Sequence, residues 1–391
     1  MRWHTDTLGS VVTDAKLGFA CGEQAEAGVF QIRMNNITKD GTLDLSKIRR
    51  IPRSIRNWEN FQLRAGDVLF NATNSPELVG KTAVFEDCGE PTVFSNHFVR
   101  IRSDTKCLDS KFLARWLQLQ FQKQVFQNMC RRWVNQATVG RDALLELKIP
   151  LPPLAEQRLI AKILERADAL RTKRRETLAR LDGLTQAIFI DMFGHPVSNP
   201  YGIPLTRLGE VGRLDRGVSK HRPRNASDLL GGPYPLVQTG EVANCDGYIR
   251  SYTQTYSDRG LRQSRMWPAG TLCVTIAANI AKTGILTFDA CFPDSVVGFT
   301  SENSATVEFV RSWLSFLQGS LEDNAPKSAQ RNINLAILRS LEVPLPSVEL
   351  RQEFAQRVTG VERLKVSHRA HLAELDALFA SLQYRAFRGE L

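Results

Sequence analysis

Apolar residues recur at intervals of three and four through two long stretches of this chain. The first stretch runs from residue 154 to about residue 192 without a proline, and its pattern predicts one continuous helix. At about 1.5 Å per residue this helix would be roughly 57 Å long. An alternation of three and four is a heptad pattern, so we expect the helix to bury its apolar stripe against a second helix. The stripe consists of Ile160, Ile163, Ala167, Leu170, Arg174, Thr177, Leu181, Leu184 and Ile188.

The same alternation returns near the end of the chain and supplies the partner. Both stripes turn polar in the middle, at Arg174 and Thr177 in the first and at Lys365 and His368 in the second, and we interpret these polar residues as fixing the helix register or meeting water. Because the connections are too short for parallel packing, the two helices should lie antiparallel and form a coiled-coil spine. The second stripe consists of Phe354, Val358, Val361, Lys365, His368, Leu372, Leu375, Phe379 and Leu382.

The stretch before the first helix has a mixed pattern. Short apolar runs at residues 68–70, 83–85 and 98–101, separated by Gly, Asn and Pro, predict strands with long connections. A helical period over residues 110–129 predicts one helix among them. Residues 1–150 are therefore predicted to form an α+β domain.

The chain also contains an internal repeat. Ile149-Pro150-Leu151-Pro152 returns as Val343-Pro344-Leu345-Pro346, a spacing of 194 residues in a chain of 391. A repeat of this size predicts approximate twofold symmetry and two similar surfaces. We place one inserted residue after the Pro-rich segment, which would align Gln157 with Gln352. The same spacing aligns Leu144 with Leu338, Leu147 with Leu341, Gln136 with Gln330, Leu184 with Leu378 and Phe193 with Phe387.

A break rich in Gly, Pro and Asn at residues 193–202 separates the copies, and the second copy repeats the landmarks of the first. Leu208-Gly209-Glu210-Val211 resembles residues 8–11, and Ala269-Gly270-Thr271-Leu272 resembles residues 65–68. The predicted fold class is therefore α+β, with two similar α+β domains joined by two long antiparallel helices that form a coiled-coil spine in a pseudo-twofold arrangement. The predicted boundaries are 1–150 for the first domain, 151–195 for the first helix, 196–345 for the second domain and 346–391 for the second helix.

Composition indicates a polyanion as a partner. The chain has 51 Lys and Arg against 41 Asp and Glu, a formal charge of +10 and a pI near 9.4. The seven cysteines are scattered without metal-ligand spacing, so we expect most of them to be buried thiols in a reducing compartment. No run of 18 apolar residues occurs, and we expect a cytoplasmic protein with no membrane partner.

Basic and amide side chains gather in predicted loops of both copies. Lys and Arg in such loops can bind phosphates, whereas Asn, Gln and Arg can bond adenine or guanine edges. The run Arg171–Arg175 lies on a helix instead, and we interpret it as a solvated face, with docking of a protein as the alternative. The candidate DNA-binding residues are Arg49, Arg50, Arg53, Arg56, Asn71, Thr73, Asn74, Lys81 and Asn96 in the first copy, and Arg216, Lys220, Arg222, Arg224, Gln238, Thr239, Asn279, Lys282, Gln330, Arg331 and Asn332 in the second.

Three motifs that could indicate catalysis are incomplete. Gly80-Lys81-Thr82 resembles the end of a phosphate-binding loop, but Ser75 stands where the loop needs glycine. Asn199-Pro200-Tyr201 resembles an adenine-methyltransferase motif that lacks its second proline. Glu146 and Lys148 could close a nuclease motif, but the upstream Pro-Asp pair is missing. We predict no catalytic and no metal-binding residues.

Residues 149–160, which read Ile-Pro-Leu-Pro-Pro-Leu-Ala-Glu-Gln-Arg-Leu-Ile, resemble the sequence that opens each conserved helix in specificity subunits of type I restriction-modification systems. The junction at residues 193–209 and the C-terminal residues 386–391 are similar to that family as well. The resemblance covers essentially the whole chain. One departure is that residues 346–352 lack the second proline and the Glu-Gln pair of the first box, so the two helix starts need not be equivalent.

The resemblance implies a non-enzymatic adaptor for double-stranded DNA. Each recognition domain would read one half of a split, asymmetric site, and the helices would set the spacer and dock two methyltransferase subunits. Restriction subunits would join the same complex. The resemblance implies no cofactor on this chain, with S-adenosylmethionine, ATP and Mg²⁺ on the partner subunits.

Two other functions remain open from the sequence. One is a sequence-specific DNA-binding protein without restriction partners. The other is a nuclease or methyltransferase with degenerate motifs, which would act on DNA by itself when given Mg²⁺ and S-adenosylmethionine.

Overall fold

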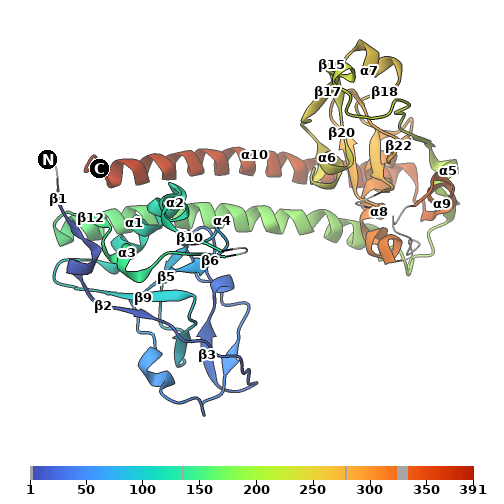
Figure 1. Cartoon of the computed structure of the whole chain (residues 1–391). Coiled ribbons are helices and arrows are strands. Elements are labelled where there is room, and N and C mark those ends of the chain that lie inside the picture. The colour runs from blue at the N-terminus through green and yellow to red at the C-terminus, as the bar shows by residue number, and fades with distance from the viewer. Residues whose placement is uncertain (1–2, 134–135, 278–279, 324–332) are drawn as a thin grey trace. The chain divides into compact units, whose positions relative to one another are not determined.

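A computed structural model describes residues 3–133, 136–277, 280–323 and 333–391 (Figure 1). The chain forms two compact units: unit 1 comprises residues 1–175 and 371–391, and unit 2 comprises residues 176–370. Two long helices, α4 (Leu154–Phe193) and α10 (Val348–Ala386), each contribute residues to both units. Each unit therefore contains one α+β domain and one half of each long helix.

Unit 1 is built on an antiparallel sheet in the order β2-β9-β5-β7, and a second sheet in the order β4-β3-β8 contains a parallel pair, β3 and β8. The strands are β1 (His4–Thr7), β2 (Val12–Leu17), β3 (Val29–Ile32), β4 (Arg50–Ile51), β5 (Val68–Asn71), β6 (Thr73–Asn74), β7 (Thr82–Val84), β8 (Thr92–Phe94), β9 (Phe98–Ser103), β10 (Arg131–Arg132), β11 (Ala137–Thr138) and β12 (Lys148–Leu151). The helices are η1 (Leu8–Val11), η2 (Met34–Asn36), η3 (Trp58–Phe61), α1 (Ser110–Gln122), α2 (Val125–Met129) and α3 (Arg141–Leu145).

Unit 2 has a main sheet in the order β14-β22-β19-β20-β16 and a second sheet in the order β17-β15-β21-β18. The strands are β13 (Leu205–Arg207), β14 (Arg213–Arg216), β15 (Leu230–Leu236), β16 (Gly247–Ile249), β17 (Gln254–Tyr256), β18 (Met266–Trp267), β19 (Leu272–Thr275), β20 (Thr283–Leu286), β21 (Ala290–Cys291), β22 (Val296–Thr300) and β23 (Glu342–Pro344). The helices are α5 (Leu208–Val211), η4 (Ser227–Leu229), α6 (Thr239–Ala243), α7 (Asp258–Arg262), α8 (Ser304–Asp323) and α9 (Leu335–Ser340).

The two units share one frame, which confirms the predicted repeat. The order β2-β9-β5-β7 corresponds to β14-β22-β19-β20, and the parallel pair β3-β8 corresponds to β15-β21. The same backbone bond joins the start of each frame to its end, from Leu8 N to Leu147 O and from Leu208 N to Leu341 O, both 2.8 Å. Unit 2 adds β16 and β18 to the shared frame.

The helix predicted over residues 110–129 is two helices. Helix α1 ends at Gln122, and Gln124 has a φ of 59°, in the left-handed region, so the chain turns before α2 begins at Val125. The periodic apolar pattern continues through this turn because α1 and α2 pack on the same core, which includes Phe112, Leu117 and Phe126.

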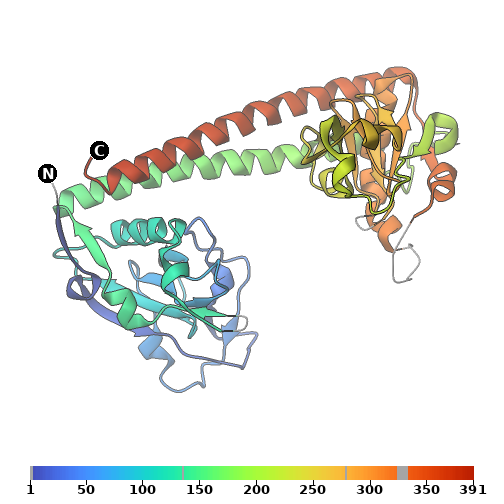
Figure 2. The ribbon, with the colours of Figure 1, turned by 45° about the horizontal axis from the view of Figure 1, so that its top comes forward.

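The long helices are antiparallel, as predicted. In unit 1, Nε of Arg171 lies 2.6 Å from Oδ1 of Asp376. In unit 2, Nζ of Lys365 lies 3.0 Å from Oδ1 of Asp182, and Arg357 pairs with Asp191 at 3.9 Å. As the residue numbers on α4 rise through these pairs, the numbers of their partners on α10 fall, so the two helices run in opposite directions. Figure 2 shows the paired halves side by side.

The second predicted stripe is confirmed, whereas the first is partly wrong. Phe354, Val358, Val361, Lys365 and Phe379 of α10 are all buried. On α4, however, Leu170 and Leu184 are exposed. The reason is that α4 packs on a recognition domain as well as on α10, which turns its buried face away from the strict heptad positions. The side chains buried in their place are Leu164, Asp168, Thr185 and Phe189.

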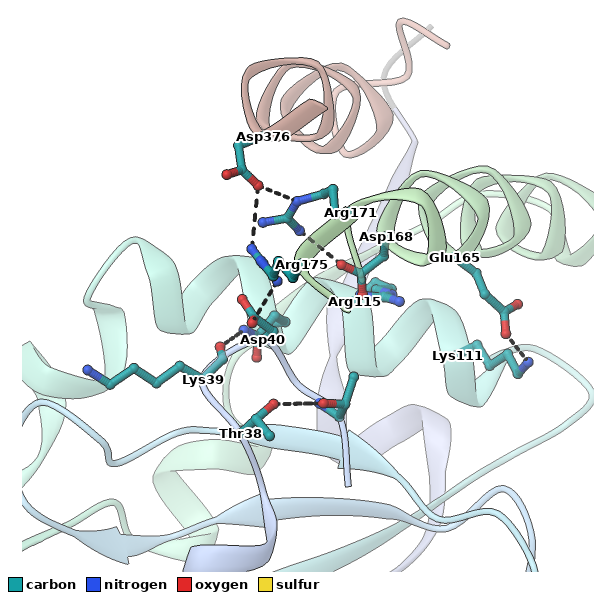
Figure 3. A network of polar contacts seen from close by, with 12 residues as sticks. Thr38, Lys39, Asp40, Lys111, Arg115, Glu165, Asp168, Arg171, Arg175 and Asp376 are labelled. Carbon is teal, nitrogen blue, oxygen red and sulfur yellow. Dashed lines mark hydrogen bonds and ion pairs between the residues drawn. The ribbon is translucent and has the colours of Figure 1, made fainter. Parts of the chain in front are cut away.

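A largely buried cation with two carboxylate partners is duplicated with the repeat. In unit 1, Arg171 bonds Asp168 of its own helix at 2.9 Å as well as Asp376 of α10 (Figure 3). In unit 2, Lys365 bonds Glu362 of its own helix at 3.2 Å as well as Asp182 of α4. The corresponding positions are 194 residues apart: 168 and 362, 171 and 365, 182 and 376.

The prediction of a solvated face for the run from residue 171 to 175 is therefore wrong for Arg171. Its side chain is only 11% exposed, and its guanidinium lies 4.3 Å from the centre of the Phe379 ring. Two carboxylates and an aromatic face compensate for the loss of water around this cation.

A second link is duplicated in the same way. Arg175 of α4 pairs with Asp40 in the loop after η2 at 3.0 Å, and Arg369 of α10 pairs with Asp246 in the loop after α6. Positions 175 and 369 are again 194 residues apart. In each unit, one long helix thus holds a loop of the recognition domain by an Arg–Asp pair.

The two helix starts are held by different side chains at one position. Gln157 is fully buried, accepts from Asp109 N at 2.9 Å and donates to the carbonyl oxygens of Cys107 and Pro152, both at 2.8 Å. In the second copy Arg351, 194 residues later, is buried and bonds Oγ1 of Thr306. The inserted residue inferred from the sequence is therefore wrong, because Arg351 and not Gln352 occupies the position of Gln157.

Apolar cores complete each unit. In unit 1, Ile160, Leu164 and Phe379 of the long helices pack with Leu113 and Leu117 of α1. In unit 2, the rings of Phe189, Phe193, Phe309, Phe316 and Phe354 cluster with centroid separations of about 5 to 6 Å. Each core needs side chains from both copies of the repeat.

Two of the seven thiols, those of Cys273 and Cys291, are buried, and the other five are partly buried. Within the described ranges, no helix is long and apolar enough to cross a membrane.

Candidate nucleic-acid interface

The first predicted basic run, residues 49–56, divides into internal and exposed side chains. Nη2 of Arg49 donates to the carbonyl oxygens of Cys21 and Gly22 at 2.8 and 3.0 Å. Arg50 forms a two-point ion pair with Glu90, which raises the pKa of Arg50 through the hydrogen bond from its side chain. Arg53 and Arg56 are exposed in the loop before η3. Of these four arginines, only Arg53 and Arg56 have guanidinium groups that face solvent.

Two predicted base-reading amides brace the frame instead of facing outward. Nδ2 of Asn71, which is fully buried, donates to the carbonyl oxygens of Thr73 and His97, both at 3.1 Å. Nδ2 of Asn74 donates to Oδ1 of Asn71 at 2.6 Å, and its Oδ1 accepts from Ser75 N at 2.8 Å. Their polar groups are used in shaping the loops on either side of β6.

Lys81 also points inward. Its side chain is buried, and Nζ donates to the carbonyl oxygens of Met34, at 2.9 Å, and of Ile37. Burial lowers the pKa of this ammonium group, and the positive charge of Lys39 lowers it further. Lys81 therefore holds the segment around η2 against β7.

The segments around this braced region lie next to one another and form one surface region of unit 1. The amides of Ala72 and Thr73 both donate to the carbonyl oxygen of His97, so the loop that carries Asn96 and His97 lies against β6. On its other side, β6 pairs with β11, and the Thr73 and Thr138 hydroxyls lie 3.2 Å apart. The structure thus brings the predicted residues Asn71, Thr73, Asn74 and Asn96 together, although only Asn96 is exposed and Thr73 half-buried.

Sequence reasoning missed the outer edge of this surface. Strand β10, residues Arg131 and Arg132, pairs with β11, and both arginines and the following Trp133 are exposed. We call Arg131, Arg132 and Trp133 the hairpin edge. Two adjacent arginines followed directly by a tryptophan are the sequence signal that could have indicated it.

His97 lies beside this surface. Burial lowers the pKa of its imidazole, and the charge of Arg33 lowers it further. A lowered pKa favours the neutral ring at pH 7, which carries one hydrogen-bond donor and one acceptor.

In unit 2, three predicted phosphate-binding residues meet around one aspartate, Asp294. Nε and Nη2 of Arg216 donate to the carbonyl oxygen of Asp294 at 2.9 and 2.7 Å. Nη2 of Arg222 lies 3.3 Å from Oδ2 of the Asp294 carboxylate, and Arg224 pairs with Oδ1. We call Arg216, Arg222 and Arg224 the arginine cluster. One carboxylate against three guanidinium groups leaves positive charge and spare N–H donors on an exposed surface, which suits a phosphate backbone.

The arginine cluster and the surface of unit 1 use the same loop of the shared frame. Pairing of β5 with β9 places Val68 opposite Ile101, and pairing of β19 with β22 places Leu272 opposite Phe299. Ile101 and Phe299 are therefore equivalent positions. Asn96 and Asp294 precede them by the same number of residues, so they are equivalent positions in the loops before β9 and β22. The two copies therefore present different chemistry at one place in one frame.

The remaining candidates are scattered. Lys220 is exposed, and its backbone N donates to Oε1 of Gln263 at 2.7 Å. Gln238 precedes α6 and donates to Oε1 of Gln254 at 2.8 Å. Thr239 begins α6, and Lys282 is half-buried before β20. The candidates that lie outside the described residues are Asn279, Gln330, Arg331 and Asn332.

Comparison with known proteins supports a recognition role for this arrangement. Residues 31–180 and 204–376 match the family described as type I restriction modification DNA specificity domain. The chain is 23% identical over 379 residues to the putative type I restriction enzyme MjaX specificity subunit of Methanocaldococcus jannaschii, covering 93% of this chain and 87% of that protein. It is 26% identical over 196 residues to the type I restriction enzyme StySPI specificity subunit of Salmonella potsdam, covering 49% of this chain and 42% of that protein.

Solved structures are similar in fold. The S subunit of a type I restriction-modification system from M. genitalium aligns with a TM-score of 0.60 at 15% identity, covering 99% of this chain and 96% of that one. A chain from a structure that addresses complex assembly and conformational transition of the type I R-M system aligns with a TM-score of 0.57 at 22% identity, covering 100% and 98%. At these identities the likeness shows the fold alone.

We predict that Arg224→Gln weakens DNA binding in a salt-dependent way. Loss of one phosphate contact should lower affinity several-fold near 0.1 M salt and reduce the slope of log affinity against log salt by about 1. Arg259→Gln is the matched control, because Arg259 is also exposed and paired with one carboxylate, that of Asp228. Fluorescence anisotropy with duplex DNA over a salt series measures both variants, and equal slopes for the two would contradict a phosphate contact by Arg224.

Proposed function

Because the chain belongs to the family of type I restriction modification DNA specificity domains, we propose that its two recognition domains each read one half of a bipartite DNA site. The observation that carries this proposal is the duplicated frame whose equivalent loops differ in chemistry. One frame carries Asn96 and His97 in the loop before β9, and the other carries Asp294 with the arginine cluster. Two domains with the same frame but different exposed side chains suit two half-sites of different sequence.

The recognition chemistry follows from these side chains. The arginine cluster, together with exposed Arg53 and Arg56, supplies guanidinium groups that can bind phosphates and orient the duplex. Exposed Asn96 and the half-buried Thr73 supply the short polar groups that can bond base edges. Asn71, Asn74 and Lys81 act indirectly, because their internal bonds hold the loops that carry these groups.

We assign the chain a recognition role and no catalytic step. Methyl transfer and cleavage then belong to partner subunits, which would bind S-adenosylmethionine, ATP and Mg²⁺. The family match concerns DNA specificity, and this division of labour is consistent with it.

The exposed leucines of the long helices support docking of two methyltransferase subunits. Leu170 and Leu364 are both exposed, as are Leu184 and Leu378, and the members of each pair are 194 residues apart. An apolar side chain exposed at the same place in both copies offers two identical partners two similar contacts. Restriction subunits would then join the assembled methyltransferase.

We also assign the helices the role of setting the spacer. Helix α4 and helix α10 each continue without interruption from one unit into the other, with 40 and 39 residues. A continuous helix has a fixed rise per residue, so its length can define a distance in base pairs.

Exchange of residues 1–150 for the corresponding domain of another family member should change one half of the recognised site and leave the other half intact. The physical reason is that each recognition domain has its own frame and its own exposed loops. Sequencing of DNA methylated by the complex with its methyltransferase gives both half-sites directly. A change in both halves would contradict independent reading.

Replacement of Leu170 and Leu364 together by Glu should abolish co-purification of the methyltransferase, because a charge at each site opposes burial of the contact. The matched control is Ile48→Glu, since Ile48 is similarly exposed but lies in a recognition domain. Pull-down through a tagged specificity chain measures the bound methyltransferase. Undiminished recovery with the double variant would place the docking surface elsewhere.

A further inference from the structure

The hairpin edge of unit 1 exposes a large aromatic side chain beside two cations. Trp133 is 71% exposed, the highest value among the exposed large apolar side chains of the described residues. Arg131 and Arg132, the two preceding residues, are exposed as well. An indole at the surface offers a flat apolar face and an N–H donor that a partner can cover.

The base of the hairpin is firmly held. Strand β10 pairs with β11 through Arg131 opposite Thr138 and Arg132 opposite Ala137, and the amide of Trp133 donates to the carbonyl oxygen of Gln136 at 2.7 Å. Strand β11 in turn pairs with β6, whose Asn74 belongs to the buried amide network. The hairpin edge thus stands on a rigid support, so ordering it on a ligand costs little conformational entropy.

The charge around the hairpin edge favours an anion. Glu77 lies within the electrostatic reach of Arg132 and Lys39, and its pKa is lowered first by its backbone hydrogen bond, then by Ser75 and by these two charges. Arg33 is exposed as well, and its positive charge acts on His97, whose carbonyl oxygen accepts from the amide of Thr73 in β6. Cations therefore outnumber the carboxylate on this surface, as a polyanionic partner requires.

From this geometry we propose that the hairpin edge is a duplex-DNA contact of unit 1, with Arg131 and Arg132 on phosphates and the Trp133 indole packed against a nucleotide of one half-site. The proposal rests on the proposed function and adds to it a residue that determines specificity. Loop residues Asn96 and Thr73 lie next along the same surface, through the Thr73–Thr138 contact. Base-edge contacts and the indole contact would then fall on neighbouring nucleotides.

The repeat places a related segment in the second copy. With the spacing of 194 residues, Gln136 aligns with Gln330, which opens the predicted base-reading set Gln330, Arg331 and Asn332. These residues lie outside the described part of unit 2, so the proposal concerns unit 1.

The test uses the full specificity chain in complex with its methyltransferase and a library of random duplex DNA, from which bound sequences are selected and sequenced. Trp133→Ala should lower affinity for the selected site about ten-fold, within the range for an aromatic contact with a base. It should relax preference in one half of the site and leave the salt dependence unchanged. Trp133→Phe should retain most of the affinity, and Arg132→Gln should reduce the salt slope by about 1.

Tyr201→Ala is the matched control, because Tyr201 is 64% exposed but lies in the segment between the copies. Affinity and preference equal to wild type in Trp133→Ala would overturn the proposal. If Trp133→Ala instead loses the methyltransferase from the complex while its sequence preference in both half-sites is unchanged, the hairpin edge contacts protein and the proposal is overturned. If the wild-type complex itself selects no bipartite sequence, the proposed function fails, which is a different result from a silent Trp133 variant.

Discussion

The antiparallel pairing of α4 with α10 is the constraint on which the rest of the structure depends. Lys365 is buried and the side chain of Arg171 is only 11% exposed, and each cation is bonded to one carboxylate of its own helix and one of the other helix. A buried cation is tolerated only with such partners, so a shifted register would leave both unpaired at a large cost in free energy. Polar residues at seam positions are a known way to fix one register at the expense of others.

This pairing also completes the apolar cores. The core of unit 1 includes Phe379 and Ala386 from α10, and the core of unit 2 includes Phe189 and Phe193 from α4. Neither copy of the repeat has a complete unit by itself. Folding of each recognition domain against its helices is therefore coupled to pairing of the helices, and the Arg–Asp links at 175 and 369 extend this coupling to a loop in each domain.

Most of the frame could be predicted from the sequence, because periodicity and repetition report burial. The 194-residue spacing, the two long helices and the polar middle of the second stripe follow from the positions of apolar residues alone. The exposed Leu170 and Leu184 could not be predicted, because the face of α4 that is buried depends on a second neighbour that the heptad pattern does not reveal. The same limit applied to Arg171, whose partners Asp168 and Asp376 are adjacent only after the helices pair.

The candidate site was harder to predict than the frame. Asn71, Asn74, Thr73 and Asn96 meet in space, yet the sequence could not separate the two amides that brace the loops from the side chains that face solvent. Lys81 has a side chain of the type that binds phosphate, but its ammonium group donates to two carbonyl oxygens inside the domain. Convergence of Arg216, Arg222 and Arg224 on Asp294 required the loop geometry, and the hairpin edge required knowledge of which strand lies beside β6.

The role of the paired helices can be measured most directly by removing one heptad from α4 between Arg171 and Asp182 and one from α10 between Lys365 and Asp376. The pairs of Arg171 with Asp376 and of Lys365 with Asp182 keep their register, and each helix shortens by about 10 Å. The deleted segments include Arg175 and Arg369, so the links of these residues to Asp40 and Asp246 are lost in the same variant. Sequencing of DNA methylated by the complex should then show both half-sites unchanged and a spacer about three base pairs shorter, at roughly 3.4 Å per base pair. An unchanged spacer in an active complex would contradict the conclusion that the helices set the distance between the half-sites.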